Sequence, residues 1–202
     1  MKKYNNKYRI ETTRLKNWDY GWNGAYFITI CTKNRIHYFG EIKNQKMQLS
    51  GIGKMAEKYW HEIPAHFPFV KLDAFIVMPN HIHGIIIIDK TNNGHIDGND
   101  GNDGRNDGRN DGRNDGRNVE TQNFASLPPP SPKNKFGPQS QNLASIIRGY
   151  KIGVSKNARK IIPGFAWQPR FYDHIIRNQK SFNKISKYII NNPINWNEDK
   201  FH

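Results

Sequence analysis

A tandem repeat near the middle of the chain limits most strongly what this sequence can fold into. Asp97 to Asn118 reads DGNDGNDGRNDGRNDGRNDGRN and contains no apolar residue. Ordering a backbone costs roughly 1–2 kcal/mol per residue, and a segment with nothing to bury cannot offset that cost. Together with the proline-rich stretch that follows, the repeat predicts a flexible low-complexity insertion over residues 91–141. A folded core must be assembled from the residues on either side.

The repeat does not follow a calcium-binding pattern. An EF-hand loop places acidic or amide groups at its first, third and fifth positions before the glycine, and a calcium-binding β-roll needs an apolar residue in each repeat. The repeat meets neither condition. The repeat holds six Asp and four Arg, which is a net charge of −2. Because the whole chain has a formal charge of +14, the residues outside the repeat carry about +16. The basic character therefore belongs to the folded part.

Length and composition narrow the class of protein. A chain of 202 residues favours a single domain over 1–202. An excess of 31 Lys and Arg over 17 Asp and Glu suits a polyanionic partner such as nucleic acid. The single cysteine, Cys31, excludes an internal disulfide and a multi-cysteine zinc site. No apolar run is long enough to cross a membrane, so we expect a cytoplasmic protein without a membrane partner.

Apolar periodicity predicts an α+β fold. Four strands are expected at 26–32, 70–78, 81–89 and within 167–177, with a short run at 38–42 pairing beside the first. Three helices are expected at 51–63, 143–158 and 182–192, the first and last capped by Ser50 and Ser181. The apolar run at 81–89 predicts a central strand covered on both faces. This order fits a ferredoxin-like antiparallel sheet covered by helices on one side.

Two histidines open the most apolar predicted strand. His81 and His83 are two residues apart, so on a strand both imidazoles project from the same face and can share one metal ion. A hydrogen-bonded, partly buried pair without metal is the alternative, and spacing alone favours it. The position at the start of a buried strand favours the metal, because two polar rings there need a partner.

The last predicted helix carries a second pair. Tyr188 and Asn192 are four residues apart and therefore lie on one helix face. An amide oxygen can ligate a hard cation, and a deprotonated phenol can attack an electrophile. The alternative is a half-buried tyrosine that packs its ring and hydrogen-bonds its hydroxyl, as most helical tyrosines do.

Four segments together resemble a known family. They are YFITICT, the MPNHIHGI around the histidines, WQPRFYDHIIRN and YIINNPINW. In this order they resemble the REP-associated tyrosine transposases, members of the single-tyrosine HUH transposase family, over most of the chain outside the insertion. The resemblance implies metal-dependent cleavage of a DNA strand in which a tyrosine becomes covalently joined to a 5′ phosphate.

The resemblance also implies roles for individual residues. His81 and His83 match the metal-binding pair, Asn192 the third metal ligand, and Tyr188 the nucleophile. A divalent cation, Mg²⁺ or Mn²⁺, held by imidazoles and an amide oxygen can neutralise and orient an anionic phosphodiester. A tyrosine has an ordinary pKa of about 10, so attack near neutral pH needs the field of the cation or a nearby base.

Other residues compete for these roles or extend them. Tyr172 is a rival nucleophile and His174 a rival ligand, but neither has the helical Asn partner or the family match. The alternative role for Tyr172 is an aromatic ring that stacks on a base or packs in the core. The alternative role for His174 is a structural hydrogen bond. The candidate DNA-binding residues are basic, and they are Arg148, Lys151, Arg159 and Arg170. Such residues are usually a solvated face, although the overall charge favours contacts with phosphate.

The sequence therefore predicts a transposase that nicks and rejoins single-stranded DNA near hairpins, through a 5′-phosphotyrosine intermediate. The expected partner is single-stranded DNA with a REP-like palindromic hairpin, and the expected assembly is a monomer or homodimer, cytoplasmic and associated with the nucleoid. Two other functions stay open. One is a nucleic-acid-binding module without catalysis, and the other is a metal phosphodiesterase that uses water, with Tyr188 purely structural.

Overall fold

The computed structural model describes residues 3–4, 7–8, 14–15, 18–91 and 140–198. The strands are β1 (Lys3–Tyr4), β2 (Lys7–Tyr8), β3 (Gly24–Cys31), β4 (Gly40–Lys43), β5 (Lys46–Leu49), β6 (Val70–Val77), β7 (His81–Ile88) and β8 (Tyr172–Ile176). The α-helices are α1 (Gly51–His61), α2 (Ile63–His66), α3 (Leu143–Ile161) and α4 (Gln179–Asn191), and the 3₁₀ helices are η1 (Lys33–Arg35) and η2 (Trp196–Glu198). The insertion predicted over 91–141 lies almost wholly outside the described residues.

Four antiparallel strands form the central sheet in the order β6-β7-β3-β8. Helix α1 lies between β3 and β6 in the chain, and α3 lies between β7 and β8. The order β3-α1-β6-β7-α3-β8 is the βαββαβ order of a ferredoxin-like fold. The predicted α+β, ferredoxin-like sheet is confirmed. No helix in the described part of the chain is both long and apolar enough to span a bilayer.

Strand β7 lies in the middle of the sheet, as its apolar sequence predicts. Alternate residues face opposite sides, so Ile82 and Ile86 join one hydrophobic cluster while Ile85 joins another. Both clusters exclude water, which explains why the strand lacks the polar face of an ordinary antiparallel strand. The prediction of a central strand covered on both faces is confirmed.

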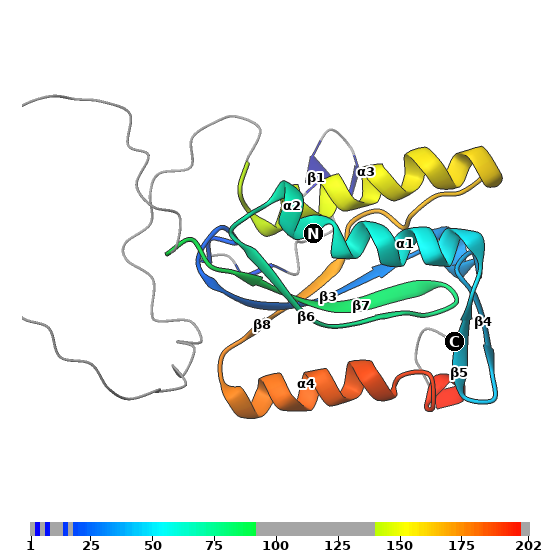
Figure 1. The fold of residues 1–202 in the computed structure, drawn as a ribbon. Coiled ribbons are helices and arrows are strands. Elements are labelled where there is room, and N and C mark those ends of the chain that lie inside the picture. The colour runs from blue at the N-terminus through cyan, green and yellow to red at the C-terminus, as the bar shows by residue number, and fades with distance from the viewer. Residues whose placement is uncertain (1–2, 5–6, 9–13, 16–17, 92–139, 199–202) are drawn as a thin grey trace, which may run out of the picture.

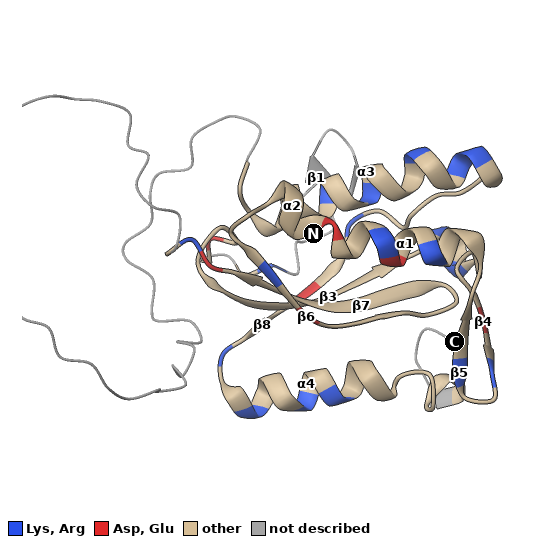
Figure 2. Ribbon diagram, in the orientation of Figure 1, with Lys and Arg blue, Asp and Glu red and all other residues tan. Residues whose placement is uncertain are grey.

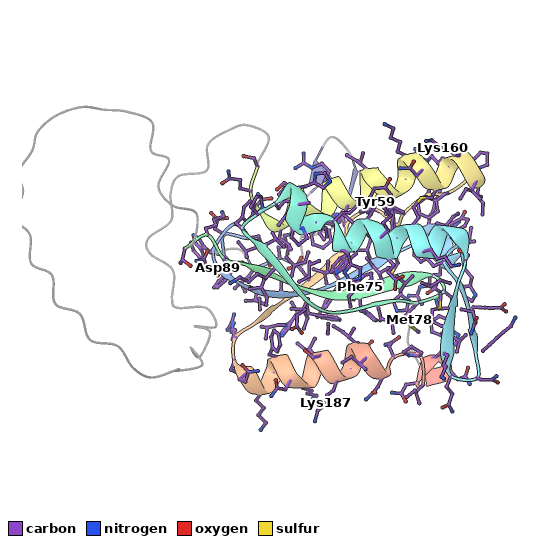
Figure 3. All side chains as sticks on the ribbon, in the orientation of Figure 1. Tyr59, Phe75, Met78, Asp89, Lys160 and Lys187 are labelled. Atoms are coloured by element: carbon purple, nitrogen blue, oxygen red, sulfur yellow. The ribbon has the colours of Figure 1, made fainter. Side chains whose placement is uncertain are left out.

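The sheet is covered on both faces, and the expectation of helices on one side is wrong. Helices α1 and α3 pack on one face, and α4 packs on the other (Figure 1). Trp60 of α1 and Tyr150 of α3 belong to the larger cluster, whereas Ile189 of α4 belongs to the smaller one. Lys160 on α3 and Lys187 on α4 accordingly project from opposite sides of the molecule (Figure 3). The two helices of the βαββαβ unit cover only one face of the sheet. Helix α4, which follows the unit in the chain, covers the other.

Two local expectations also need correction. The run at 38–42 forms β4, which pairs with β5 in a separate hairpin rather than beside β3. Helix α4 begins before Ser181, because the side chain of Asn178 accepts a hydrogen bond from the Ser181 backbone N–H and is the N-cap. Ser50 caps α1 as predicted, with its hydroxyl accepting from Gly53 N.

Candidate active site on the α4 face of the sheet

The two histidines of β7 meet on the sheet face that α4 covers. His81 and His83 are both buried, and their Nε2 atoms lie 3.1 Å apart. The period of two along a strand places both rings on this face. The sequence prediction that the two imidazoles project together is therefore matched by the geometry.

A hydrogen bond at Nδ1 orients each imidazole. His81 Nδ1 donates to the Asn80 side-chain oxygen at 2.8 Å, and His83 Nδ1 lies 2.8 Å from the Thr29 hydroxyl. Because a carbonyl oxygen only accepts, a neutral His81 ring that makes this bond carries its proton on Nδ1 and presents a lone pair at Nε2. Metal-binding histidines are oriented in the same way, with one ring nitrogen held by a hydrogen bond so that the other faces the ion.

Helix α4 brings Tyr188 to this pair from more than a hundred residues away in the sequence. Its hydroxyl lies 3.3 Å from His83 Nε2, and its ring centroid is 5.3 Å from that of His83. The Tyr188 ring also meets Phe27 of β3 edge-on. The side chain is 41% exposed, so a large substrate can reach the hydroxyl while the ring stays supported by the sheet.

Asn192 follows the C-terminal end of α4, between two residues that contact the histidines. Asn192 is buried and follows the last helical residue. Tyr188 contacts His83, and Trp196 in η2 stacks on His81 with ring centroids 6.0 Å apart. The segment between those two contacts therefore spans the histidine pair, and Asn192 is at its midpoint.

The donor atoms fit a divalent cation. Two ligands bound at right angles about 2.1 Å from an octahedral ion are about 3 Å apart, close to the 3.1 Å between the two Nε2 atoms. The same separation is also that of a hydrogen bond between the two imidazoles, the alternative that the spacing of the histidines favours. Among the described residues, no group of three or more His, Cys, Asp or Glu is placed to hold a metal. The candidate ligand atoms here are two imidazole nitrogens and an amide oxygen.

The rival residues lie on the same sheet face but farther from the pair. Tyr172 and His83 are both paired with Thr29, from strands on opposite sides of β3. Two strand spacings, about 9.6 Å, therefore separate their backbones. Tyr172 is exposed and packs edge-on against Phe27, and His174 is exposed beside it. The Tyr188 hydroxyl, in contrast, lies within 3.3 Å of a nitrogen of the buried pair.

The predicted DNA-binding residues gather on the other face of the sheet. Arg148, Lys151 and Arg159 line a groove of about 770 Å³ between α3 and residues 166–171, with Lys156 also on its wall. Basic residues follow the length of α3 (Figure 2). Arg170 lies in the segment that borders the groove and adopts a left-handed φ of 67°. None of these residues is on the α4 face.

Two of these cations also hold the chain together. Lys151 Nζ donates to the carbonyl oxygens of Gln168 and Arg170 at 2.9 and 3.1 Å, and burial lowers the pKa of its ammonium group. Arg159 Nε donates to the Phe165 carbonyl at 3.1 Å. These bonds fix the far wall of the groove to α3. Arg148 and Lys156 also line the groove, and both side chains are exposed.

Sequence reasoning missed the residues that support the site. Thr29 and Asn80 orient the histidines, Phe27 packs against His83 with centroids 5.4 Å apart, and Trp196 packs against His81. Phe27 and Thr29 occur in one of the segments that carry the resemblance, but strand pairing had to be known before they could be placed near the histidines. Asn80 directly precedes His81, so its proximity could be read from the sequence. Trp196 continues the four-residue spacing of Tyr188 and Asn192, which was a usable signal.

Comparison with known proteins finds a sequence relative and a solved structure with a similar fold. No protein-family model matches the chain. The chain is 38% identical over 193 residues to a Haemophilus influenzae protein described as uncharacterized, a match that covers 94% of this chain and 91% of the relative. This level of identity over nearly the full length of both proteins shows that the two share a family.

A solved structure has the same fold. It is a REP-associated tyrosine transposase bound to a REP hairpin, with a TM-score of 0.52 and 16% identity. The similarity covers 95% of this chain and 77% of the other. The resemblance drawn from the four sequence segments is confirmed at the level of the fold.

Proposed function

The chain belongs to the same family as the Haemophilus influenzae protein and has the fold of a REP-associated tyrosine transposase, and from this premise we propose that it is a transposase acting on single-stranded DNA near hairpins. The observation that carries the proposal is the meeting of three groups: the Tyr188 hydroxyl lies 3.3 Å from His83 Nε2, which lies 3.1 Å from His81 Nε2. A nucleophile and a pair of metal-ligand atoms then share one partly open site.

In the proposed reaction the Tyr188 oxygen attacks the phosphorus of a DNA phosphodiester. A bond forms between the Tyr188 oxygen and phosphorus, and the bond from phosphorus to the 3′ oxygen breaks. The phenol loses its proton and the leaving 3′ oxygen gains one, so no oxidant, reductant or nucleotide cofactor is consumed. Because the 5′-phosphotyrosine keeps the energy of the broken bond, a 3′ hydroxyl can later attack it and reseal the strand.

The residues that would hold the divalent cation are His81, His83 and Asn192. When bound, such an ion neutralises the charge of the phosphodiester and lowers the barrier to attack by an oxygen nucleophile. The chain contributes the orientation of both imidazoles through Asn80 and Thr29. It also keeps the histidines buried, so that water is excluded from the rear of the site.

The proposed DNA reaches both faces of the sheet. The cations of the α3 groove lie opposite the α4 face, so a strand that contacts both has to pass around an edge of the sheet (Figures 1 and 2). The structural neighbour is bound to a REP hairpin, and a single strand that extends from such a hairpin is long enough to do so. The protein would act as a monomer or homodimer on palindromic repeats in the nucleoid.

A trapping experiment tests the proposal. We expect the full chain, incubated with Mn²⁺ and a single-stranded oligonucleotide that contains a hairpin, to yield a protein–DNA adduct that survives denaturant and electrophoresis. The adduct should disappear when the metal is chelated before the DNA is added. A non-catalytic binding module would shift the DNA in a native gel without an adduct, and a water-using phosphodiesterase would release cut DNA without one. Either result contradicts the proposal.

The α3 groove makes a separate prediction for binding. Replacing both Arg148 and Lys156 with Ala should weaken binding of the hairpin oligonucleotide and flatten the plot of log affinity against log salt by about 1.5, because each lost phosphate contact removes about 0.7–0.9 from the slope. Lys46→Ala, on the exposed β5 strand of the separate hairpin, is the matched control and should leave the slope unchanged. Fluorescence anisotropy at several salt concentrations measures both. Equal slopes in all three proteins would remove the groove from the DNA path.

A further inference from the structure

Trp196 lies against the histidine pair but is unused by the mechanism above. It begins η2, just after α4, and is only 7% exposed. Its ring stacks on His81 with an interplanar angle of 27°, and the His37 ring also meets it, at 64° with centroids 5.8 Å apart. Among the described residues, neither hydrophobic cluster of the core includes Trp196.

The two histidines are held by the same combination of contacts. Each has a hydrogen bond at Nδ1, and each has an aromatic ring against its face: Phe27 for His83 and Trp196 for His81. A hydrogen bond at Nδ1 fixes the position of one ring atom but does not by itself set the tilt of the imidazole plane. A ring packed on its face removes this freedom and fixes the direction of Nε2.

The two aromatic supports come from different parts of the fold. Phe27 belongs to β3, in the interior of the sheet, whereas Trp196 belongs to the segment that also carries Tyr188 and Asn192. The orientation of His81 therefore depends on the docking of that C-terminal segment. His83 has the Phe27 ring of the sheet against it, in addition to its contact with Tyr188.

We propose that Trp196 is a positioning residue that holds the His81 imidazole with Nε2 directed toward His83, so that the divalent-cation pair is complete only when the C-terminal segment is docked. The proposal rests on the proposed function, because it assigns Trp196 a role in the cation site of that function. It adds a residue with no donor atom for the ion, whose effect passes through His81.

Metal affinity in the absence of DNA tests the proposal. We expect Trp196→Leu to bind Mn²⁺ roughly tenfold more weakly than the natural chain, in the range found when supporting residues of metal ligands are removed. Trp196→Phe keeps an aromatic ring and should recover most of the affinity. His37→Ala removes the contact on the outer side of Trp196 and should change the affinity less than twofold. Calorimetric titration of the full chain measures all four.

A second readout needs no metal. The Trp196 ring current should displace the ring-proton resonances of His81 from those of an unstacked histidine. The displacement should be lost in Trp196→Leu and partly kept in Trp196→Phe, measured at a temperature where both variants are folded. A residue that merely fills space would lower the unfolding temperature of the Leu variant while leaving its Mn²⁺ affinity and the His81 resonances unchanged. That pattern would overturn the proposal.

The two proposals fail in different ways. If the natural chain binds Mn²⁺ and Trp196→Leu weakens binding but no covalent adduct with DNA forms, the transposase function is wrong and the role of Trp196 stands. If the adduct forms and Trp196→Leu binds Mn²⁺ normally, the role of Trp196 is wrong. If the natural chain binds no Mn²⁺, the cation site fails, and this role of Trp196 fails with it.

Discussion

Replacing Tyr188 with Phe should reduce the amount of denaturant-resistant protein–DNA adduct by more than about a thousandfold, because removing a nucleophile removes the step itself rather than part of its stabilisation. The substitution deletes one oxygen and keeps the ring, which packs against His83 and Phe27. The fold, Mn²⁺ binding and DNA affinity should therefore stay within about twofold of the natural chain. Adduct formation is measured by denaturing electrophoresis of labelled DNA.

Tyr172→Phe is the matched control. Tyr172 lies on the same sheet face and also packs against Phe27, yet it is on the far side of β3 from the histidines. The adduct should persist in this variant. An adduct that survives in Tyr188→Phe and is lost in Tyr172→Phe would transfer the role of nucleophile to the rival tyrosine.

His81→Ala separates the proposed mechanism from hydrolysis by water. A metal phosphodiesterase that uses water would still cut DNA in Tyr188→Phe and would stop cutting in His81→Ala. The proposed transposase loses cleavage in both. A variant pair in which only His81→Ala is inactive would make Tyr188 a structural residue.

Most elements of the fold could be predicted from local patterns. The strand at β7 follows from a continuous apolar run, and α1 follows from three- and four-residue apolar spacing after Ser50. In such patterns the apolar residues recur with the period of the helix or strand whose face is buried, so their spacing indicates the type of element. The helix α3, with Leu143, Ile146 and Tyr150 buried, was predicted in the same way.

The predictions that were wrong are those about which other element a helix or strand packs against. The apolar line of α4 shows that one side of the helix is buried, but it does not state which face of the sheet buries it. The pairing of β4 with β5 instead of β3 depends on the turn between them, where Asn44 and Gln45 both adopt left-handed φ angles that sequence patterns did not reveal.

In the candidate site, too, the features set by local spacing could be predicted, and the features set by tertiary contacts could not. His81 with His83, and Tyr188 with Asn192, were each predictable as pairs because a strand and a helix have fixed periods. The approach of one pair to the other is a tertiary contact, and it was inferred from the family resemblance. Thr29 contacts His83 only because β3 pairs with β7, so no local pattern indicated its role. Trp196, which packs on His81, was indicated only by its four-residue spacing from Asn192.

Gly84→Ala should cost about 3 kcal/mol of unfolding free energy, at the upper end of what an inserted methyl costs in a close-packed core. A Cβ at Gly84 would overlap Trp60 Cζ2 and lie 2.7 Å from Cη2. The Trp60 ring is fully buried and stacks on Phe75 with centroids 4.5 Å apart, so it has no space into which to move. Urea denaturation measures the loss.

The same substitution at Gly149 gives the control, because a Cβ there meets Phe67 no closer than 3.7 Å. Gly149 is inside α3, where Ala is the better helix former, so Gly149→Ala should be neutral or stabilising by up to about 1 kcal/mol. Opposite signs for the two substitutions would tie the loss at Gly84 to the Trp60 contact. Equal effects would contradict that assignment.

A double variant identifies the contact itself. Phe at position 60 lacks the outer indole atoms that the new methyl group meets, so Gly84→Ala should cost at least about 1 kcal/mol less in a Trp60→Phe background than in the natural chain. Gly84 follows His83 on β7 and faces the opposite side of the sheet. A methyl group that displaces β7 away from Trp60 would move His83 toward α4 and away from Thr29. Gly84→Ala should therefore also weaken Mn²⁺ binding at temperatures where the variant is folded, and Trp60→Phe should restore that binding together with the stability, because both losses arise from the displacement of one strand.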